Sequence, residues 1–158
     1  MMAVTALGAG LALPLFAQSS APSTSSAAAS GHAKKASRMP VYPIPQKMTR
    51  SGGSVKVPAL KLIGAKDAPT MNALKSMFAL SPNGLPVQMS IIKGSKKPAG
   101  NIPQKAGAYS LSVTPQGIRM TGYDDEGLFY AAQTLLQLAE KTPSGVTIPQ
   151  VEVLDWPD

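Results

Sequence analysis

The sequence predicts an α/β domain of the two-layer α+β type between residues 40 and 158. Some stretches alternate apolar and polar residues, which is typical of strands, and others repeat apolar residues at helical spacing. A hairpin pattern joins two of the alternating stretches. The chain has 158 residues, 44% of them hydrophobic, as expected for one globular domain of ordinary size.

The first half of this domain predicts two strands with a helix between them. Residues 55–63 (VKVPALKLI) and 86–94 (PVQMSIIKG) alternate in the manner of strands, with Gln88 on the polar side of the second. Residues 69–80 (PTMNALKSMFAL) place apolar side chains at helical spacing. Pro69 stands where a proline is tolerated in the first turn.

The second half predicts a hairpin followed by a helix. Residues 108–122 hold two alternating runs joined by TPQG, in which Pro115 presets φ for the first central position of a turn. From Leu128 to Ala139 apolar residues recur at helical spacing, so we expect a helix that ends near Lys141.

Three adjacent carboxylates, Asp124, Asp125 and Glu126, stand at the start of this second helix. Acidic residues there accept hydrogen bonds from free amide protons and oppose the positive end of the helix dipole. Paired catalytic carboxylates instead need opposed positions around a substrate and pKa values pushed apart. We therefore interpret the three acids as a cap and predict no catalytic, substrate-binding or metal-binding residue in this chain.

Composition and motifs exclude several kinds of chemistry. The chain has no cysteine and a single histidine, His32, so a zinc site is not expected. The glycine-rich nucleotide loops and the GxSxG and HExxH patterns are absent from the sequence. We predict no cofactor.

The first 39 residues predict export. Residues 1–17 form an uncharged apolar run of signal-peptide length, too short to span a bilayer, so no stable membrane insertion is expected. Residues 18–39 are mostly small and polar, rich in serine and alanine, and predict a disordered linker. The domain of residues 40–158 is expected to reach the periplasm or the extracellular space.

Basic residues are concentrated in the first part of the domain. Residues 41–110 hold ten basic residues against Asp67 alone, whereas residues 111–158 hold two against seven acidic ones. Such a basic half could favour anionic envelope polymers, but a solvated surface is the favoured interpretation. Nucleic acid is not an expected partner, because no aromatic residues are interleaved with the basic ones.

Four stretches in order carry a family resemblance: VYPIPQKMT (41–49), GAYSLSVTPQGIRMTGYDDEGLFYAAQTLLQL (107–138), IPQVEV (148–153) and LDWPD (154–158). Within the second, Gly127 and Tyr130 are followed by the run QTLLQL (133–138). Together they resemble the small α/β domain that precedes the catalytic barrel of glycoside hydrolase family 20, the β-N-acetylhexosaminidases.

The resemblance implies a twisted sheet of four or more strands, mostly antiparallel or mixed, with two helices packed on one face. It implies docking against a catalytic barrel that is absent from this chain, with Trp156 and Pro157 at the junction. The parent would be a secreted enzyme that removes terminal N-acetylhexosamine residues from glycans, assisted by the acetamido group of the substrate. This chain alone is expected to be inactive, and the glycan is expected to be bound by the parent enzyme as a whole.

The family's catalytic Asp-Glu pair belongs to a His-x-Gly-Gly-Asp-Glu motif far along the barrel. Nothing in this sequence matches that motif, so Asp125 and Glu126 do not correspond to the pair.

Two alternatives remain open at this point. Similar domains precede the barrels of glycoside hydrolase family 84 and of some α-glucuronidases. A free-standing exported module that binds glycans or the envelope is the other alternative. Such modules usually display aromatic side chains, yet only 5% of residues are aromatic, and Tyr109, Phe129 and Tyr130 are expected inside the domain or at its margin.

Overall fold

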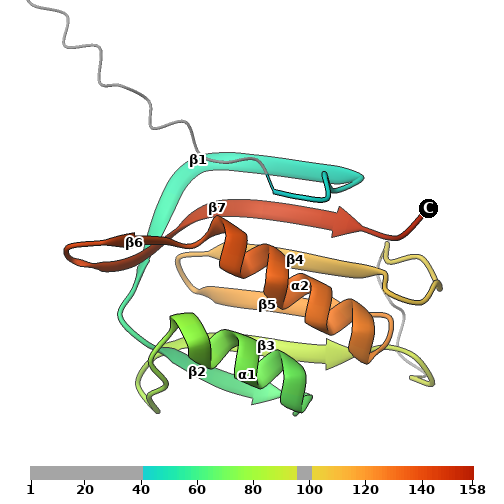
Figure 1. Ribbon diagram of the computed structural model, residues 1–158, viewed down its shortest axis with the longest axis horizontal. Helices are drawn as coiled ribbons and strands as arrows, with labels where there is room; N and C mark the ends of the chain where they lie inside the picture. The colour runs from blue at the N-terminus through green and yellow to red at the C-terminus, as the bar shows by residue number, and fades with distance from the viewer. Residues whose placement is uncertain (1–40, 96–100) are drawn as a thin grey trace, which may run out of the picture. The chain divides into compact units, whose positions relative to one another are not determined.

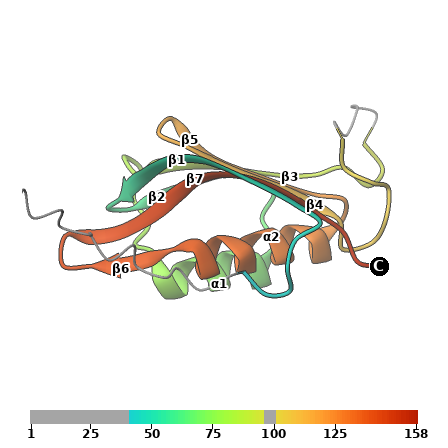
Figure 2. The same cartoon turned by 90° about the horizontal axis from the view of Figure 1, so that it is seen from above.

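A mixed sheet with two helices on one face forms the domain in the computed structural model, which describes residues 41–95 and 101–158 (Figures 1 and 2). This confirms the predicted fold class. The predicted signal-like segment (1–17), the linker (18–39) and His32 lie outside the described residues.

Nine elements follow one another in the described part of the chain. They are β1 (Lys47–Val57), β2 (Leu60–Gly64), α1 (Ala68–Met77), β3 (Leu85–Ile91), β4 (Tyr109–Thr114), β5 (Gly117–Gly122), α2 (Asp125–Leu138), β6 (Glu140–Thr142) and β7 (Gly145–Asp155).

The strand order is β1-β7-β4-β5-β3-β2, and β6 pairs with β7 outside this path. Parallel pairing joins β2 to β3 and β3 to β5, whereas the other pairs are antiparallel. The predicted hairpin is confirmed as β4 and β5, with Val113 opposite Ile118.

The stretch 55–63, predicted as one strand, is divided between two. It contains the end of β1, which pairs with β7, and most of β2, which pairs with β3 near the other edge of the sheet. Pro58 lies in the break between the two strands. Proline has no amide proton, so within a strand it would remove a hydrogen bond from the ladder. The second predicted strand, 86–94, is confirmed as β3, which ends earlier than expected at Ile91.

Both predicted helices form, and both end earlier than the pattern indicated. Asp67 caps α1 by accepting a hydrogen bond of 2.9 Å from the Thr70 amide, and α1 gives way to extended backbone at Phe78. Helix α2 ends at Leu138 instead of near Lys141, because Glu140–Thr142 pair with β7 as β6.

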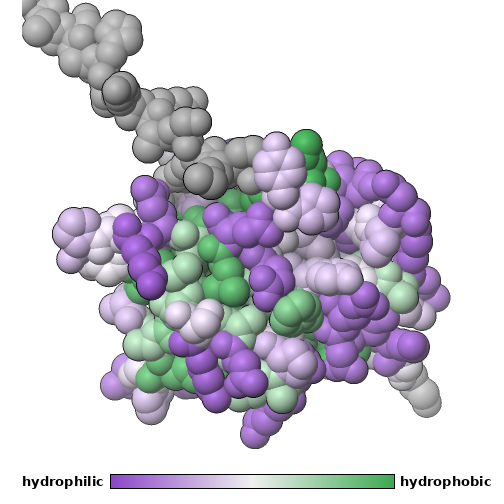
Figure 3. All heavy atoms as spheres, viewed as in Figure 1, coloured by the Kyte–Doolittle hydropathy of each residue, from purple (hydrophilic) through white to green (hydrophobic). Residues whose placement is uncertain are grey.

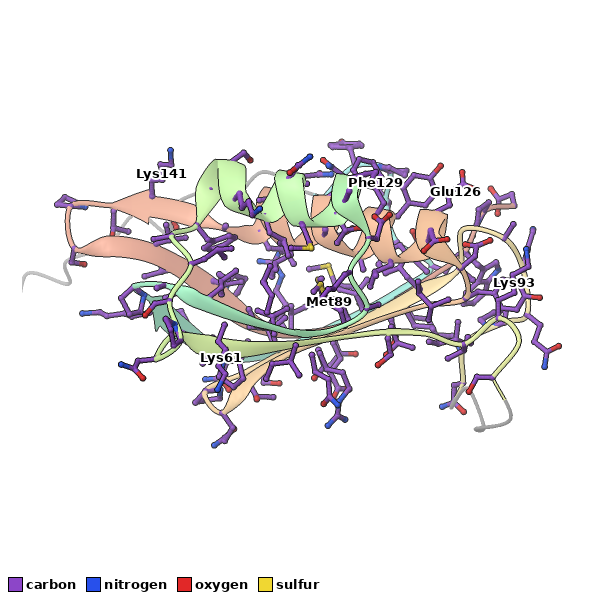
Figure 4. The ribbon with its side chains drawn as sticks, turned by 90° about the horizontal axis from the view of Figure 1, so that it is seen from below. Lys61, Met89, Lys93, Glu126, Phe129 and Lys141 are labelled. Carbon is purple, nitrogen blue, oxygen red and sulfur yellow. The ribbon has the colours of Figure 1, made fainter. Side chains whose placement is uncertain are left out.

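The hydrophobic core lies between the helices and the sheet. Figure 4 shows Met89 in this layer, whereas Lys61 points away from the opposite face of the sheet. Fully buried core side chains include Leu60, Leu74, Val87, Leu111, Met120, Leu128, Leu135 and Val151. The two layers leave two broad surfaces, the outer side of the helices, called here the helix face, and the open sheet face opposite it.

None of the helices in the described residues has the length and apolar character needed to cross a membrane.

Candidate docking surface and the acidic helix start

Asp124 caps α2, where the sequence predicted a cap from either Asp124 or Asp125. Its Oδ1 atom accepts hydrogen bonds from the Gly127 amide at 3.0 Å and from the Gly107 amide at 3.1 Å. One carboxylate therefore satisfies the helix start and also fixes the segment that leads into β4. This second contact, with Gly107, is not visible in the local sequence pattern.

Asp125 and Glu126 follow in the first turn, and both are exposed. The Tyr130 hydroxyl donates a hydrogen bond of 2.6 Å to Glu126 Oε1, and this bond raises the pKa of Tyr130. The described residues contain no cluster of acidic and histidine side chains able to hold a metal ion. Asp124 and Glu126 thus have separate partners, and the three acids do not converge on a shared site, while their lack of a catalytic role remains a prediction.

Gly127 allows α2 to approach the chain closely. A Cβ atom built there would lie 2.2 Å from the Ala108 carbonyl oxygen, a backbone atom that cannot move aside easily. The Gly127 amide also donates a hydrogen bond to the capping Asp124 carboxylate. Gly127 is therefore needed to place the start of α2 against residues 107–108.

A buried hydroxyl pair links β4 to α2. The Tyr109 hydroxyl and Thr134 Oγ1 lie 2.6 Å apart, and both residues are buried. Burial is the main reason why the pKa of Tyr109 rises from 10.0 to about 12, and the nearby Asp155 carboxylate adds to the increase. The sequence indicated that Tyr109 lies inside, but Thr134 gave no signal beyond being a polar residue on the apolar side of a helix.

The helix face carries apolar side chains that are only partly covered, and one of them, Leu136, also packs against the core. Phe129 and Leu136 of α2 are half-buried, and Tyr130 is exposed. Figure 4 shows Phe129 on the outer side of α2, away from the sheet. The ring centroids of Phe129 and Tyr130 lie 6.3 Å apart. Figure 3, which views this side, shows hydrophobic side chains in patches between polar ones.

The segment after β7 is held beside the start of α2. Lys105 Nζ donates a hydrogen bond to the Pro157 carbonyl oxygen. A Cβ atom at Gly107 would lie 3.0 Å from Pro157 and 3.1 Å from the Tyr130 ring, so these three residues are close neighbours. The exit from the domain is therefore adjacent to the helix face.

The open sheet face carries a shallow hollow of about 1010 Å³ over β7, β4, β5 and β3. Polar side chains such as Ser112, Arg119 and Glu152 line it, and none of the described residues around it is aromatic. The described basic residues do not form one patch, since Lys61 lies on this face and Lys75 on α1. These features favour a solvated surface over a sugar-binding one.

Residues 38–156 match the family model described as glycosyl hydrolase family 20, domain 2. A relative from Vibrio vulnificus named Beta-hexosaminidase is 40% identical over 74 residues, which are 47% of this chain and 8% of the relative.

Several solved structures are similar in fold, and two of them serve as examples. CpGH84B has a TM-score of 0.61 at 21% identity, over 74% of this chain and 22% of its own. The GH20 exo β-N-acetylglucosaminidase from Vibrio harveyi has a TM-score of 0.57 at 20% identity, over 75% of this chain and 19% of its own. At these identities the structures show the fold alone, and the chain spans only a small part of each relative. The match covers most of the chain and decides which family it is: this chain belongs to glycosyl hydrolase family 20, as domain 2 of that family.

Proposed function

We propose that the chain is the non-catalytic α/β domain of a secreted bacterial β-N-acetylhexosaminidase, which removes terminal N-acetylhexosamine residues from glycans. The observation that carries this proposal is the match of residues 38–156 to domain 2 of the family. The identity of 40% to a protein named Beta-hexosaminidase supports the same activity for the parent enzyme.

Within that enzyme the domain would support a catalytic barrel. Phe129 turns apolar surface outward from the helix layer, Leu136 exposes the part of its side chain that the core leaves uncovered, and Tyr130 adds to this surface beside the exit at Pro157. Apolar surface of this kind is typical of an interface. Most of the length of each relative lies outside the matched region, which leaves room for a barrel to cover this face.

Catalysis would reside in the barrel. The Asp124 carboxylate is bonded to two backbone amides, and Glu126 is bonded to Tyr130. Neither acid is directed with the other toward a common substrate position, as paired catalytic carboxylates require. The glycan would bind to the catalytic barrel of the parent enzyme and not to this domain.

Export of the parent is part of the proposal. The apolar run of residues 1–17 and the small, polar residues 18–39 support a signal segment and a linker ahead of the domain. The destination would be the periplasm or the extracellular space.

The test compares two proteins: the product of the complete reading frame and residues 1–158 alone. We expect the complete product to hydrolyse 4-nitrophenyl N-acetyl-β-D-glucosaminide and the shorter chain to be inactive. Turnover by residues 1–158 would contradict the interpretation of the acids. An inactive complete product, together with binding of residues 1–158 to chitin or peptidoglycan, would favour the free-standing module instead.

A further inference from the structure

A short segment ahead of β1 presents the two most exposed large hydrophobic side chains in the described residues. This segment, Val41–Gln46, is called the strap. Tyr42 is 63% exposed and Ile44 is 74% exposed, whereas Val41 is buried in the core. Figure 2 shows the strap curving past α2 on its way to β1.

The strap is fixed near both ends, although its side chains are exposed. The Gln137 side chain of α2 accepts a hydrogen bond from the Tyr42 amide at 2.8 Å and donates one to the Tyr42 carbonyl oxygen at 2.9 Å. At the other end the Gln46 amide donates to Asp155 Oδ1 at 3.0 Å, and Gln46 Nε2 donates to Asp158 Oδ1 at 2.9 Å. Tyr42 and Ile44 therefore project from a backbone that is already positioned.

Such an arrangement has the character of a preformed binding surface. Burying apolar side chains at an interface is most effective when their backbone needs no further ordering, because less conformational entropy is lost on binding. Anchor residues of interfaces are commonly large side chains, with tyrosine among the most frequent. Most of the surface of Tyr42 and of Ile44 is left uncovered, so their exposed apolar area is available to a partner.

The position of the exit indicates which partner. Asp158 is hydrogen-bonded to Gln46, and only Pro45 separates Gln46 from Ile44, a span of at most about 7 Å along the chain. In longer relatives the polypeptide that follows this exit would emerge beside the strap. The exit is therefore adjacent to the strap and, through Pro157 and Tyr130, also to the helix face.

We propose that Tyr42 and Ile44 are anchor side chains by which this domain docks onto the catalytic barrel of the same polypeptide, and that Gln137 and Gln46 hold them in place. This inference rests on the proposed function for the identity of the partner. It goes further in assigning the docking contact to named residues outside both helices.

The experiment measures the midpoint of thermal unfolding, Tm, for two lengths of protein, residues 1–158 and the product of the complete reading frame. Each is prepared as wild type, as Ile44→Ser and as Tyr42→Ser/Ile44→Ser. Ile63→Ala is the matched control, because Ile63 is an exposed large hydrophobic residue on the open sheet face.

In residues 1–158 we expect every variant to unfold within about 1–2 °C of wild type, because exposed side chains contribute little to the stability of the domain. In the complete product we expect the double variant to lower the Tm of this domain by roughly 4 °C or more, and the single variant by less. Ile63→Ala should leave both lengths unchanged.

Three outcomes would overturn the proposal. One is an equal loss at both lengths, which would place the two side chains in the packing of the domain itself. Another is an unchanged Tm in the complete product. The third is concentration-dependent dimerisation of residues 1–158 that the double variant abolishes, which would make a second copy the occupant.

Hydrolysis of the aryl glycoside separates this proposal from the proposed function. If the complete product is active but the double variant does not lower its Tm, the proposed function stands and the anchor proposal is rejected. If the complete product is inactive but the double variant lowers its Tm as expected, the anchor proposal stands and the proposed function is rejected.

Discussion

Replacing Asp124 by alanine should destabilise the domain far more than replacing its neighbour Asp125. Asp124 Oδ1 accepts two backbone hydrogen bonds, from Gly127 at the helix start and from Gly107 ahead of β4. Asp125 is exposed, and no hydrogen bond of its side chain is seen within the described residues. The two variants remove the same charge from adjacent positions and differ mainly in these contacts.

The magnitude follows from the two bonds. Loss of an N-cap costs about 1 kcal/mol. The Gly107 amide lies in a buried residue, so leaving it without a partner adds about 1–3 kcal/mol. We expect Asp124→Ala to lower the free energy of unfolding by about 2–4 kcal/mol, and Asp125→Ala by about 0.5 kcal/mol through the helix dipole alone.

Urea unfolding of residues 1–158, followed by far-UV circular dichroism, measures this difference. The midpoint should fall by roughly 1–2 M for Asp124→Ala at an unchanged slope. Asp124→Asn should retain most of the stability, because asparagine caps helices about as well as aspartate. If Asp124→Ala came within about 0.5 kcal/mol of Asp125→Ala, the structural account of the acids would be wrong.

Three further predictions concern the packing of α2 and are read from the same unfolding curves. Tyr109→Phe removes the hydroxyl partner of the buried Thr134 and should cost about 1 kcal/mol at neutral pH. Because the folded state raises the pKa of Tyr109 from 10.0 to about 12, wild type should lose stability as the pH rises from 10 to 12, and Tyr109→Phe should lose less; parallel curves would contradict this. Gly127→Ala should cost about 2–3 kcal/mol, since the added methyl meets the Ala108 carbonyl oxygen, and a neutral result would show that α2 can move away. Leu135→Ala, at a fully buried position, should cost about 2–5 kcal/mol, and a loss below 1 kcal/mol would place Leu135 outside the core.

The sequence predicted best where the structure depends on short-range patterns. The β4–β5 hairpin has alternating apolar residues joined by a proline turn, and α2 has a long apolar stripe preceded by acids, so both were found. The acidic cap of α2 was predicted for the same reason, although the sequence did not decide between Asp124 and Asp125. Each of these features is specified by residues within about 15 positions of one another.

Features that depend on distant residues were missed. The break at Pro58 sends two neighbouring strands to distant partners, which alternation alone cannot show. Strand β6 is only three residues long and forms because Glu140–Thr142 meet β7. The Gln137 contacts with Tyr42 join positions 95 residues apart, and no local pattern reports them.

The most direct test of the account is the solvent exposure of side chains in the complete protein. Hydroxyl-radical labelling followed by mass spectrometry reports the oxidation rate of Phe129, Leu136 and Tyr130 on the helix face and of Ile63 on the open sheet face. Compared with residues 1–158 alone, the complete product should show slower oxidation at the three helix-face residues and an unchanged rate at Ile63. Unchanged rates on the helix face, or protection confined to Ile63, would contradict a supporting domain that docks its helices against a catalytic barrel.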